Sequence, residues 1–242
     1  MQILICGKGG AGKSAITILM AREFMKHGLV YIIDSDESNR LLPKLLGAET
    51  PNTLANYLGG RRQLSKGLSK LNNIHLNKLG EEYIKKSPEG IYLASIGKIE
   101  EFGEGCACPF ALLSKVLLKN MVLEENETVL IDTEAGVEHL GRSVEESIDA
   151  IIVIVDPTAE AVAIAKLLKD EANRICKPFY MILNKMTPEV EDIMLKKVKD
   201  MGLFAAARIR YDSVIFRSGL EGGRLSASSA QGEIASFINT NF

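Results

Sequence analysis

The residues with the clearest chemical potential form a glycine-rich loop between an apolar run at 3–6 and a helix-like run. This loop, residues 7–14, reads GKGGAGKS. It fits the pattern G-x-x-x-x-G-K-[ST] in the strand-then-helix context that a phosphate-binding loop requires. Glycines let successive backbone N–H groups turn toward one anion, and the following helix adds partial positive charge at the same point. A glycine-rich turn without a ligand is the minor alternative.

Two side chains at the end of this loop have definite chemical roles. Lys13 is expected to meet the β- and γ-phosphates of a nucleotide, and the Ser14 hydroxyl is expected to ligate Mg²⁺. The sequence therefore predicts ATP or ADP as ligand, together with Mg²⁺. The residues expected to surround the phosphates are Gly7, Lys8, Gly9, Gly10, Ala11, Gly12, Lys13, Ser14 and Ala15.

Acidic side chains end two further apolar runs. Residues 29–33 lead into Asp34 and Asp36, and residues 128–131 lead into Asp132. Ligands bind beyond the carboxyl ends of the strands in an open parallel sheet, so we expect these carboxylates to face the phosphates. Asp132 is then a Mg²⁺ ligand, usually through water. Spacing alone does not choose between Asp34 and Asp36 as the carboxylate that orients water, and helix capping by Asp36 or Ser38 is the alternative for this segment.

A cysteine pair is the second chemically informative feature. Residues 103–109 read GEGCACP, and apolar residues follow at helical spacing, which places Cys108 at the helix N-cap. A thiol there loses its proton more easily and becomes a better metal ligand. Cys106 and Cys108 supply two sulfurs, whereas Zn²⁺ or Ni²⁺ generally takes about four ligands, so a two-fold dimer would complete the set. Two inert thiols are the alternative.

The elements that must position these groups alternate between strand-length apolar runs and helix-like segments. This order predicts an α/β fold with a single doubly wound, mostly parallel sheet flanked by helices, in one domain over 1–242. Residues 48–90 are expected to hold short helices and one or two minor strands. The predicted strands are 3–6, 29–33, 91–96, 128–132, 150–155, 179–185 and 203–209, and the clearest later helices are 39–46, 160–175, 189–201 and 231–238.

Composition and charge restrict the partners. The 242 residues are 46% hydrophobic with a net charge of −2, which gives no electrostatic case for nucleic acid or an anionic membrane. The sequence shows neither a membrane-spanning apolar run nor a basic leader, so a cytoplasmic location is expected. Four cysteines in such a chain indicate thiols or metal ligands rather than disulfides, and Cys6 and Cys176 are predicted to be small buried residues.

Residues 8–14 resemble the deviant Walker A motif of the MinD/ParA-like ATPases, a group that includes the nitrogenase iron protein. The mark of that group is an extra lysine near the start of the loop, which Lys8 matches. The resemblance implies a nucleotide-sandwich homodimer in which Lys8 reaches the partner's phosphates and stabilises developing negative charge. It also implies that Asp36 positions the attacking water, so the expected catalytic residues are Lys8, Lys13 and Asp36.

Two further segments complete the expected nucleotide site. Gly136 could offer its backbone N–H to the γ-phosphate, which would make residues 133–142 a switch between the ATP and ADP states. Asn184 and Lys185 resemble the base-reading segment of the same family, in which an asparagine amide pairs with the adenine edge. Ordinary turn polarity is the alternative. Arg210 stands where relatives commonly carry a proline that packs on the base.

The cysteine segment and residues 134–142 (EAGVEHLGR) together resemble the CooC-type ATPases. That family assists nickel insertion into carbon monoxide dehydrogenases, related accessory proteins serve acetyl-CoA synthase, and C-x-C pairs from two subunits bind a metal at the dimer interface. The resemblance implies an ATP-hydrolysing metallochaperone with Ni²⁺ or Zn²⁺ at Cys106 and Cys108. It implies homodimerisation on binding ATP or metal, with a nickel-dependent carbon monoxide dehydrogenase or acetyl-CoA synthase as client. A MinD/ParA-like positioning ATPase and an Fe–S-carrying reductase are the alternatives.

Overall fold

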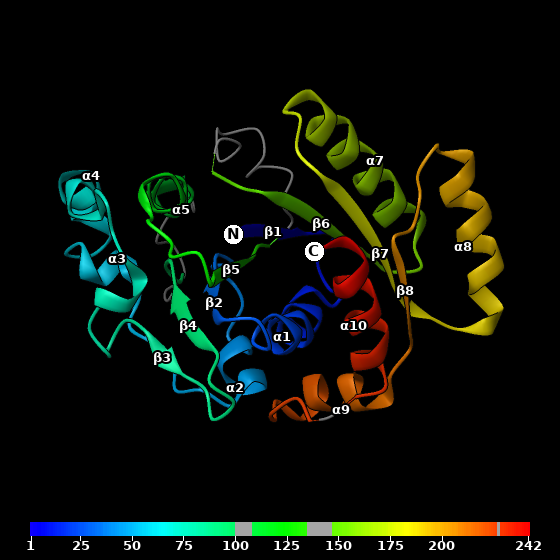
Figure 1. Cartoon of the computed structure of the whole chain (residues 1–242), viewed down its shortest axis with the longest axis horizontal. Helices are drawn as coiled ribbons and strands as arrows, with labels where there is room; N and C mark the ends of the chain where they lie inside the picture. The colour runs from blue at the N-terminus through cyan, green and yellow to red at the C-terminus, as the bar shows by residue number, and fades with distance from the viewer. Residues whose placement is uncertain (100–107, 135–146, 227) are drawn as a thin grey trace.

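The chain forms an eight-stranded sheet with helices on both faces (Figure 1). The structure is a computed structural model that describes residues 1–99, 108–134, 147–226 and 228–242. The strand order is β3-β4-β2-β5-β1-β6-β7-β8, and every neighbouring pair is parallel except β3 with β4. This confirms the predicted α/β fold with a doubly wound, mostly parallel sheet. The strands are β1 (Gln2–Cys6), β2 (Leu29–Asp34), β3 (Lys85–Lys86), β4 (Tyr92–Ser95), β5 (Glu127–Asp132), β6 (Ala150–Val155), β7 (Phe179–Met186) and β8 (Ala207–Arg210).

The helices occupy the expected places between the strands, and residues 48–90 contain short helices, 3₁₀ turns and the two-residue strand β3, as predicted. None of the helices in the described ranges is long and apolar enough to cross a membrane. The α-helices are α1 (Lys13–Phe24), α2 (Leu42–Leu46), α3 (Leu54–Tyr57), α4 (Leu64–Gly67), α5 (Cys108–Asn120), α7 (Ala159–Arg174), α8 (Pro188–Asp200), α9 (Ser213–Glu221) and α10 (Ala230–Asn241). The 3₁₀ turns are Arg61–Gln63, Leu68–Leu71 and Leu76–Lys78.

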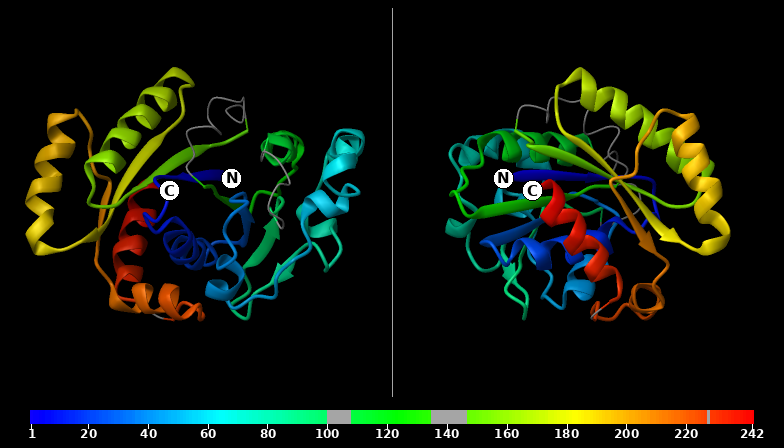
Figure 2. Two further views of the ribbon diagram at one scale, coloured as in Figure 1. Left: turned by 180° about the vertical axis from the view of Figure 1, so that it is seen from behind. Right: turned by 45° about the vertical axis from the view of Figure 1, so that its right-hand side comes forward.

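Two hydrophobic clusters cover the two faces of the sheet because successive strand residues point to opposite sides. On β1, Ile3 and Ile5 belong to the cluster that includes residues of α1, α2 and α10, whereas Leu4 and Cys6 belong to the cluster that includes residues of α3, α5, α7 and α8. Figures 1 and 2 show α1 and α10 on one side of the strands and α5 and α7 on the other. The central strands are buried on both faces and read as nearly continuous apolar runs.

Strand register gathers the predicted site at one edge of the sheet. Ile5 near the end of β1 lies opposite Asp132, and Asp132 in turn lies opposite Asp34 at the end of β2. The glycine-rich loop leaves the same end of β1. Parallel strands therefore bring the loop and both acidic segments together at their carboxyl ends, where open α/β sheets bind ligands.

Three local predictions need correction. Cys6 is buried as expected, and burial raises the pKa of its thiol to about 12, but Cys176 is exposed. Cys176 lies in the left-handed region (φ 54°), in the short turn between α7 and β7. The last strand begins at Ala207 rather than at 203, because the Leu203 N–H bonds to the carbonyl of Val198 and closes the end of α8. Helix α2 begins at Leu42 rather than at 39, with Pro43 in its first turn.

Candidate nucleotide-binding site

The loop between β1 and α1 has a backbone that only glycine fits at two positions. Gly7 has φ 139°, and a Cβ there would lie 2.2 Å from the carbonyl oxygen of Ile154. Gly12 has φ 97°, and a Cβ there would lie 2.4 Å from Nδ2 of Asn184. The close approach of β6 and β7 to the loop therefore fixes its shape before any ligand binds.

The backbone N–H groups at the N-terminus of α1 are available to an anion. Gly12 is the N-cap, no described side chain caps it, and the first turn of α1 carries no acidic residue. Lys13 is only 7% exposed, and its Nζ donates to the carbonyl oxygens of Gly7 (3.0 Å) and Lys8 (3.1 Å). A buried ammonium and a helix N-terminus thus face the same space, which is the arrangement that binds phosphate.

A hydrogen-bonded chain of three side chains lies next to this loop. The Ser14 hydroxyl donates to Oδ2 of Asp132 (2.5 Å), and Nδ2 of Asn39 donates to Oγ of Ser14 (2.9 Å). Burial raises the pKa of Asp132 to about 7, opposed by the Ser14 hydrogen bond and reinforced by the Asp34 carboxylate. Sequence reasoning missed Asn39, since only the folded acidic segment brings it to Ser14.

The same chain fits a hydrated Mg²⁺ ion. Oδ1 of Asp132 is buried and has no hydrogen-bond partner within the part of the chain that the structure describes. Such an atom is costly unless a cation or a water occupies its lone pairs. A hydroxyl and a carboxylate oxygen are ligands that Mg²⁺ accepts, so Ser14 and Asp132 are suited to hold it, directly or through water.

The structure separates the two acidic residues that spacing left equivalent. Asp34 is 1% exposed, and its Oδ2 accepts a hydrogen bond from Nζ of Lys98 (2.6 Å). Burial raises its pKa to about 6, although the Lys98 ammonium works against this shift. Asp36 instead lines the cavity beside the loop, and its Oδ1 accepts the backbone N–H groups of Ser38 and Asn39. Asp36 is therefore both a turn-capping residue and the carboxylate with access to a ligand.

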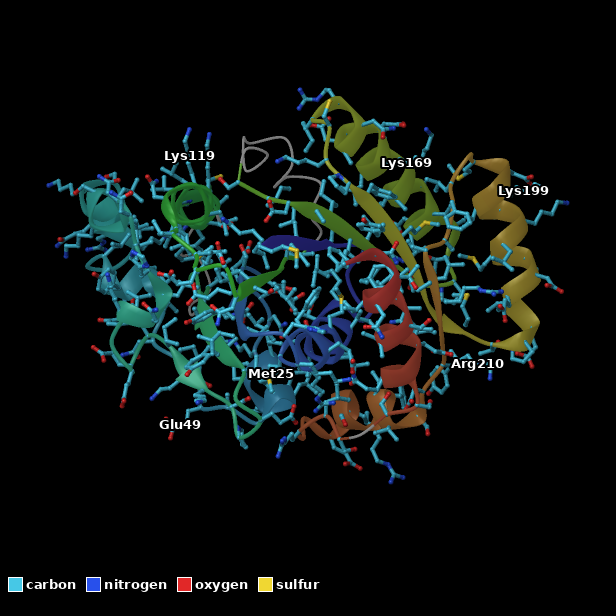
Figure 3. The ribbon with its side chains drawn as sticks, viewed as in Figure 1. Met25, Glu49, Lys119, Lys169, Lys199 and Arg210 are labelled. Carbon is cyan, nitrogen blue, oxygen red and sulfur yellow. The ribbon has the colours of Figure 1, made fainter. Side chains whose placement is uncertain are left out.

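A cavity of about 870 Å³ extends from this polar end across the surface of α9. Its far end is apolar: Tyr211, Phe216 and Leu220 line it with exposed fractions of 47%, 57% and 75%. The Tyr211 and Phe216 rings lie 6.0 Å apart, centroid to centroid. Arg210, labelled in Figure 3, lines the cavity too, and its backbone N–H donates to Glu233, a bond that the expected proline could not make. Sequence reasoning missed this aromatic end.

Asn184 and Lys185 reach the loop from the end of β7. Nδ2 of Asn184, a 4% exposed residue, donates to the carbonyl oxygen of Ala11 (2.8 Å). Nζ of Lys185 donates to the carbonyl oxygen of Gly10 (2.6 Å), and both residues line the cavity. Both side chains therefore stabilise the conformation of the loop through these hydrogen bonds.

The additional lysine of the loop lies outside this polar interior. Nζ of Lys8 forms an ion pair with Glu160 on the first turn of α7, at 3.0 Å. This hydrogen bond raises the pKa of Lys8. Two other predicted positions, Gly136 and Cys106, fall outside the described residues. Cys108 is exposed and begins α5.

Fold and site together define the class. The mostly parallel sheet, with the loop after its central strand β1 and acidic ends on β5 and on the next strand, β2, has the fold of the P-loop ATPases of the MinD/ParA family. The septum site-determining protein MinD of Pyrococcus horikoshii, solved with Mg-ADP, superposes with a TM-score of 0.69 over 99% of this chain and 95% of its own, at 19% identity. No family model matches the chain.

Sequence comparison gives the particular family. The chain is 41% identical over 242 residues to the uncharacterized ATP-binding protein MJ0084 of Methanocaldococcus jannaschii, covering 96% of both chains. It belongs to the family of that ATP-binding protein and is itself nucleotide-binding. The carbon monoxide dehydrogenase accessory protein CooC of Rhodospirillum rubrum is a more distant relative, 29% identical over 89% of this chain and 85% of its own length.

Proposed function

We propose that the protein hydrolyses ATP and uses the nucleotide cycle to bind and release a metal ion on behalf of a client metalloenzyme. The observation that carries this proposal is a nucleotide site with Asp36 facing the cavity, in a chain related over most of its length to CooC. The client would be a nickel-dependent carbon monoxide dehydrogenase or acetyl-CoA synthase. The metal carried would be Ni²⁺ or Zn²⁺.

The described residues divide the work of hydrolysis. Lys13 and the backbone of the loop hold the β- and γ-phosphates, while Asp36 orients the attacking water toward the γ-phosphorus. The bond from phosphorus to the β–γ bridging oxygen breaks, and the leaving oxygen of ADP is left near Lys13. Mg²⁺, held by Ser14 and Asp132, supplies charge neutralisation to the phosphate oxygens when bound. The backbone N–H of Gly136 is proposed to contact the γ-phosphate.

Lys8 has a second role in this proposal. When ATP brings two copies together, Lys8 leaves Glu160 and reaches the phosphates of the partner, where it stabilises negative charge in the transition state. An exposed ion pair is weak, so releasing Lys8 costs little. Asn184 and Lys185 are proposed to contact the base or the loop that holds it.

The metal is the cargo of this cycle. Cys106 and Cys108 of two copies would supply four thiolates to one ion when ATP closes the dimer. Hydrolysis would then separate the two pairs and release the ion. In this scheme the dimer is the unit that holds the metal, because a single pair supplies too few ligands.

The test is metal titration with and without ATP, followed by a mass measurement of the complex in solution. We expect one Ni²⁺ or Zn²⁺ per dimer and a lower apparent Kd with ATP. Cys106→Ala combined with Cys108→Ala should abolish metal binding and keep ATP hydrolysis. Cys176→Ala is the matched control, because this exposed thiol lies at the end of α7 and should leave metal binding unchanged.

Three outcomes would contradict the proposal. A protein that stays monomeric with nucleotide and metal both supplied lacks the proposed coupling. Stoichiometric metal binding by the double cysteine variant would place the ion elsewhere. Co-sedimentation with liposomes or DNA only in the presence of ATP would favour a positioning ATPase instead.

A further inference from the structure

A lysine that the sequence analysis did not single out connects residues 96–99 to the acidic segment that contains Asp34 and Asp36. Lys98 follows β4, is 16% exposed, and donates through Nζ to Oδ2 of Asp34 and to the main-chain oxygen of Asp36, both at 2.6 Å. The second bond fixes the backbone of the residue that faces the ATP cavity. Charge-assisted hydrogen bonds of this length are stronger than those between neutral groups.

Further bonds join the same two segments. The backbone N–H of Ile99 donates to the carbonyl oxygen of Glu37 (3.3 Å), and Nη2 of Arg40 donates to the carbonyl oxygen of Ile99 (2.9 Å). The Ile96 N–H donates to the carbonyl oxygen of Asp34 (2.9 Å). Residues 96–99 and 34–40 are therefore linked at several successive points, and a shift of one displaces the other.

On its other side this segment packs against the helix that carries Cys108. Gly97 has room only for hydrogen, since a Cβ there would lie 2.5 Å from the ring of Phe110. Phe110 is 6% exposed and lies in the first turn of α5, two residues after Cys108. One turn further along, Oγ of Ser114 is 3.2 Å from Oγ of Ser35, and both side chains are buried.

We propose that Lys98 is a positioning residue that holds Asp36 for hydrolysis and transmits the state of the nucleotide site to Cys108 through Gly97 and Phe110. The inference rests on the proposed function and names the residues through which a change at the nucleotide site would alter the position of Cys108. Closely packed groups do not deform gradually, so a displacement of residues 34–40 on ATP binding passes to the first turn of α5. All residues of this route are described in the structure.

The variants are chosen to separate positioning from folding. Lys98→Met alone leaves Asp34 buried without its partner, so that protein can simply fail to fold. The double variant with Asp34→Asn and Lys98→Met removes both charges together and still lacks the bond to Asp36. Lys98→Arg keeps a donor for both oxygens. Lys85→Met is the matched control, because Lys85 pairs with Glu49 (labelled in Figure 3) at 2.8 Å on the β3 edge of the sheet.

Two readouts are measured on the full-length, metal-free protein. The first is steady-state ATP hydrolysis, for which the double variant should lose about 10- to 100-fold in kcat with little change in KM. The second is the rate at which a maleimide labels Cys108, mapped by mass spectrometry, with and without a non-hydrolysable ATP analogue. Cys176 is the internal reference, since it is exposed at the end of α7.

The expected result is a nucleotide-dependent change of at least about fivefold in the labelling rate of Cys108 in the wild type. The double variant should lose this change, while Lys98→Arg and Lys85→Met should keep it, and Cys176 should not respond. An equal response of Cys108 in the wild type and the double variant, including no response in either, overturns the inference. Labelling needs nucleotide binding only, so a wild type that fails to hydrolyse ATP contradicts the proposed function and leaves the labelling readout intact.

Discussion

The two ends of the nucleotide cavity are built differently. At the phosphate end, Lys13, Ser14 and Asn39 already have hydrogen-bond partners in the protein. At the other end, Tyr211 and Phe216 are about half exposed, and α9 buries only Ser218. The first end stands on the central strands of the sheet, whereas the second stands on a segment after the edge strand β8. The phosphate end is therefore preorganised, whereas the side chains of the base end become more ordered when a ligand binds.

The comparison predicts that the phosphate end carries most of the affinity. Lys13→Ala removes a charged donor that is 7% exposed and is proposed to contact the phosphates, so ATP affinity should fall on the order of 100-fold, about 3 kcal/mol. Isothermal titration with ATP measures this. Lys26→Ala is the control, because Lys26 lies just past the other end of α1, with its partner Glu23. Equal loss in both variants would mean that general charge, not the loop, binds the nucleotide.

A buried carboxyl group at the phosphate end should also lower the stability of the fold as pH rises. Asp132 has its pKa raised to about 7 by burial, so the folded protein keeps a proton there that the unfolded chain loses above its ordinary value near 3.8. Stability from this residue is therefore lost progressively as pH rises from about 4 to about 7. Asp132→Asn should stabilise the nucleotide-free protein by on the order of 2 kcal/mol at about pH 8 and far less at about pH 4.

Denaturant unfolding at the two pH values measures this difference. In the same variant, Mg²⁺-dependent ATP hydrolysis should be lost, because the neutral amide is a poor ligand for Mg²⁺. A stability gain that is equal at both pH values would show that the carboxylate is not held protonated by burial.

The sequence predicted the phosphate end because its signals are local. The glycine pattern, the flanking runs and the acidic strand ends can each be found within a few residues, and parallel pairing then brings them together. Spacing could not choose between Asp34 and Asp36, and only the family resemblance favoured Asp36, since the physical difference depends on Lys98, 64 residues away from Asp34 in the chain. Tyr211 and Phe216 were missed because neither belongs to a motif. Tyr211 lies between β8 and α9, Phe216 lies on α9, and their exposed rings acquire meaning only beside the loop.

The base end should contribute a smaller share of the affinity. Tyr211→Ala removes one ring of the aromatic pair, so ATP affinity should fall by about 10-fold, and Tyr211→Phe should keep most of it. Binding of inorganic tripolyphosphate should not change, because it has no base. The control is Phe204→Ala, which removes an aromatic side chain that is 77% exposed and does not line the cavity. Equal losses for ATP and tripolyphosphate would place Tyr211 outside the base site.

The smallest effect concerns Lys8, which belongs to neither end of the cavity in the single chain. Glu160→Gln removes its partner at 3.0 Å and leaves Lys8 available to a second copy, so ATP-dependent dimerisation should tighten. Glu160 is exposed and Lys8 is partly exposed, and pairs at such surface positions are weak, so the gain should stay below about fivefold in the dimer Kd measured by sedimentation. Asp170→Asn is the control, because it breaks the Lys166 pair on the same helix with the same change of charge. A similar shift in both variants would assign the effect to net charge, whereas a shift confined to Glu160→Gln would show that α7 competes with the partner's phosphates for Lys8.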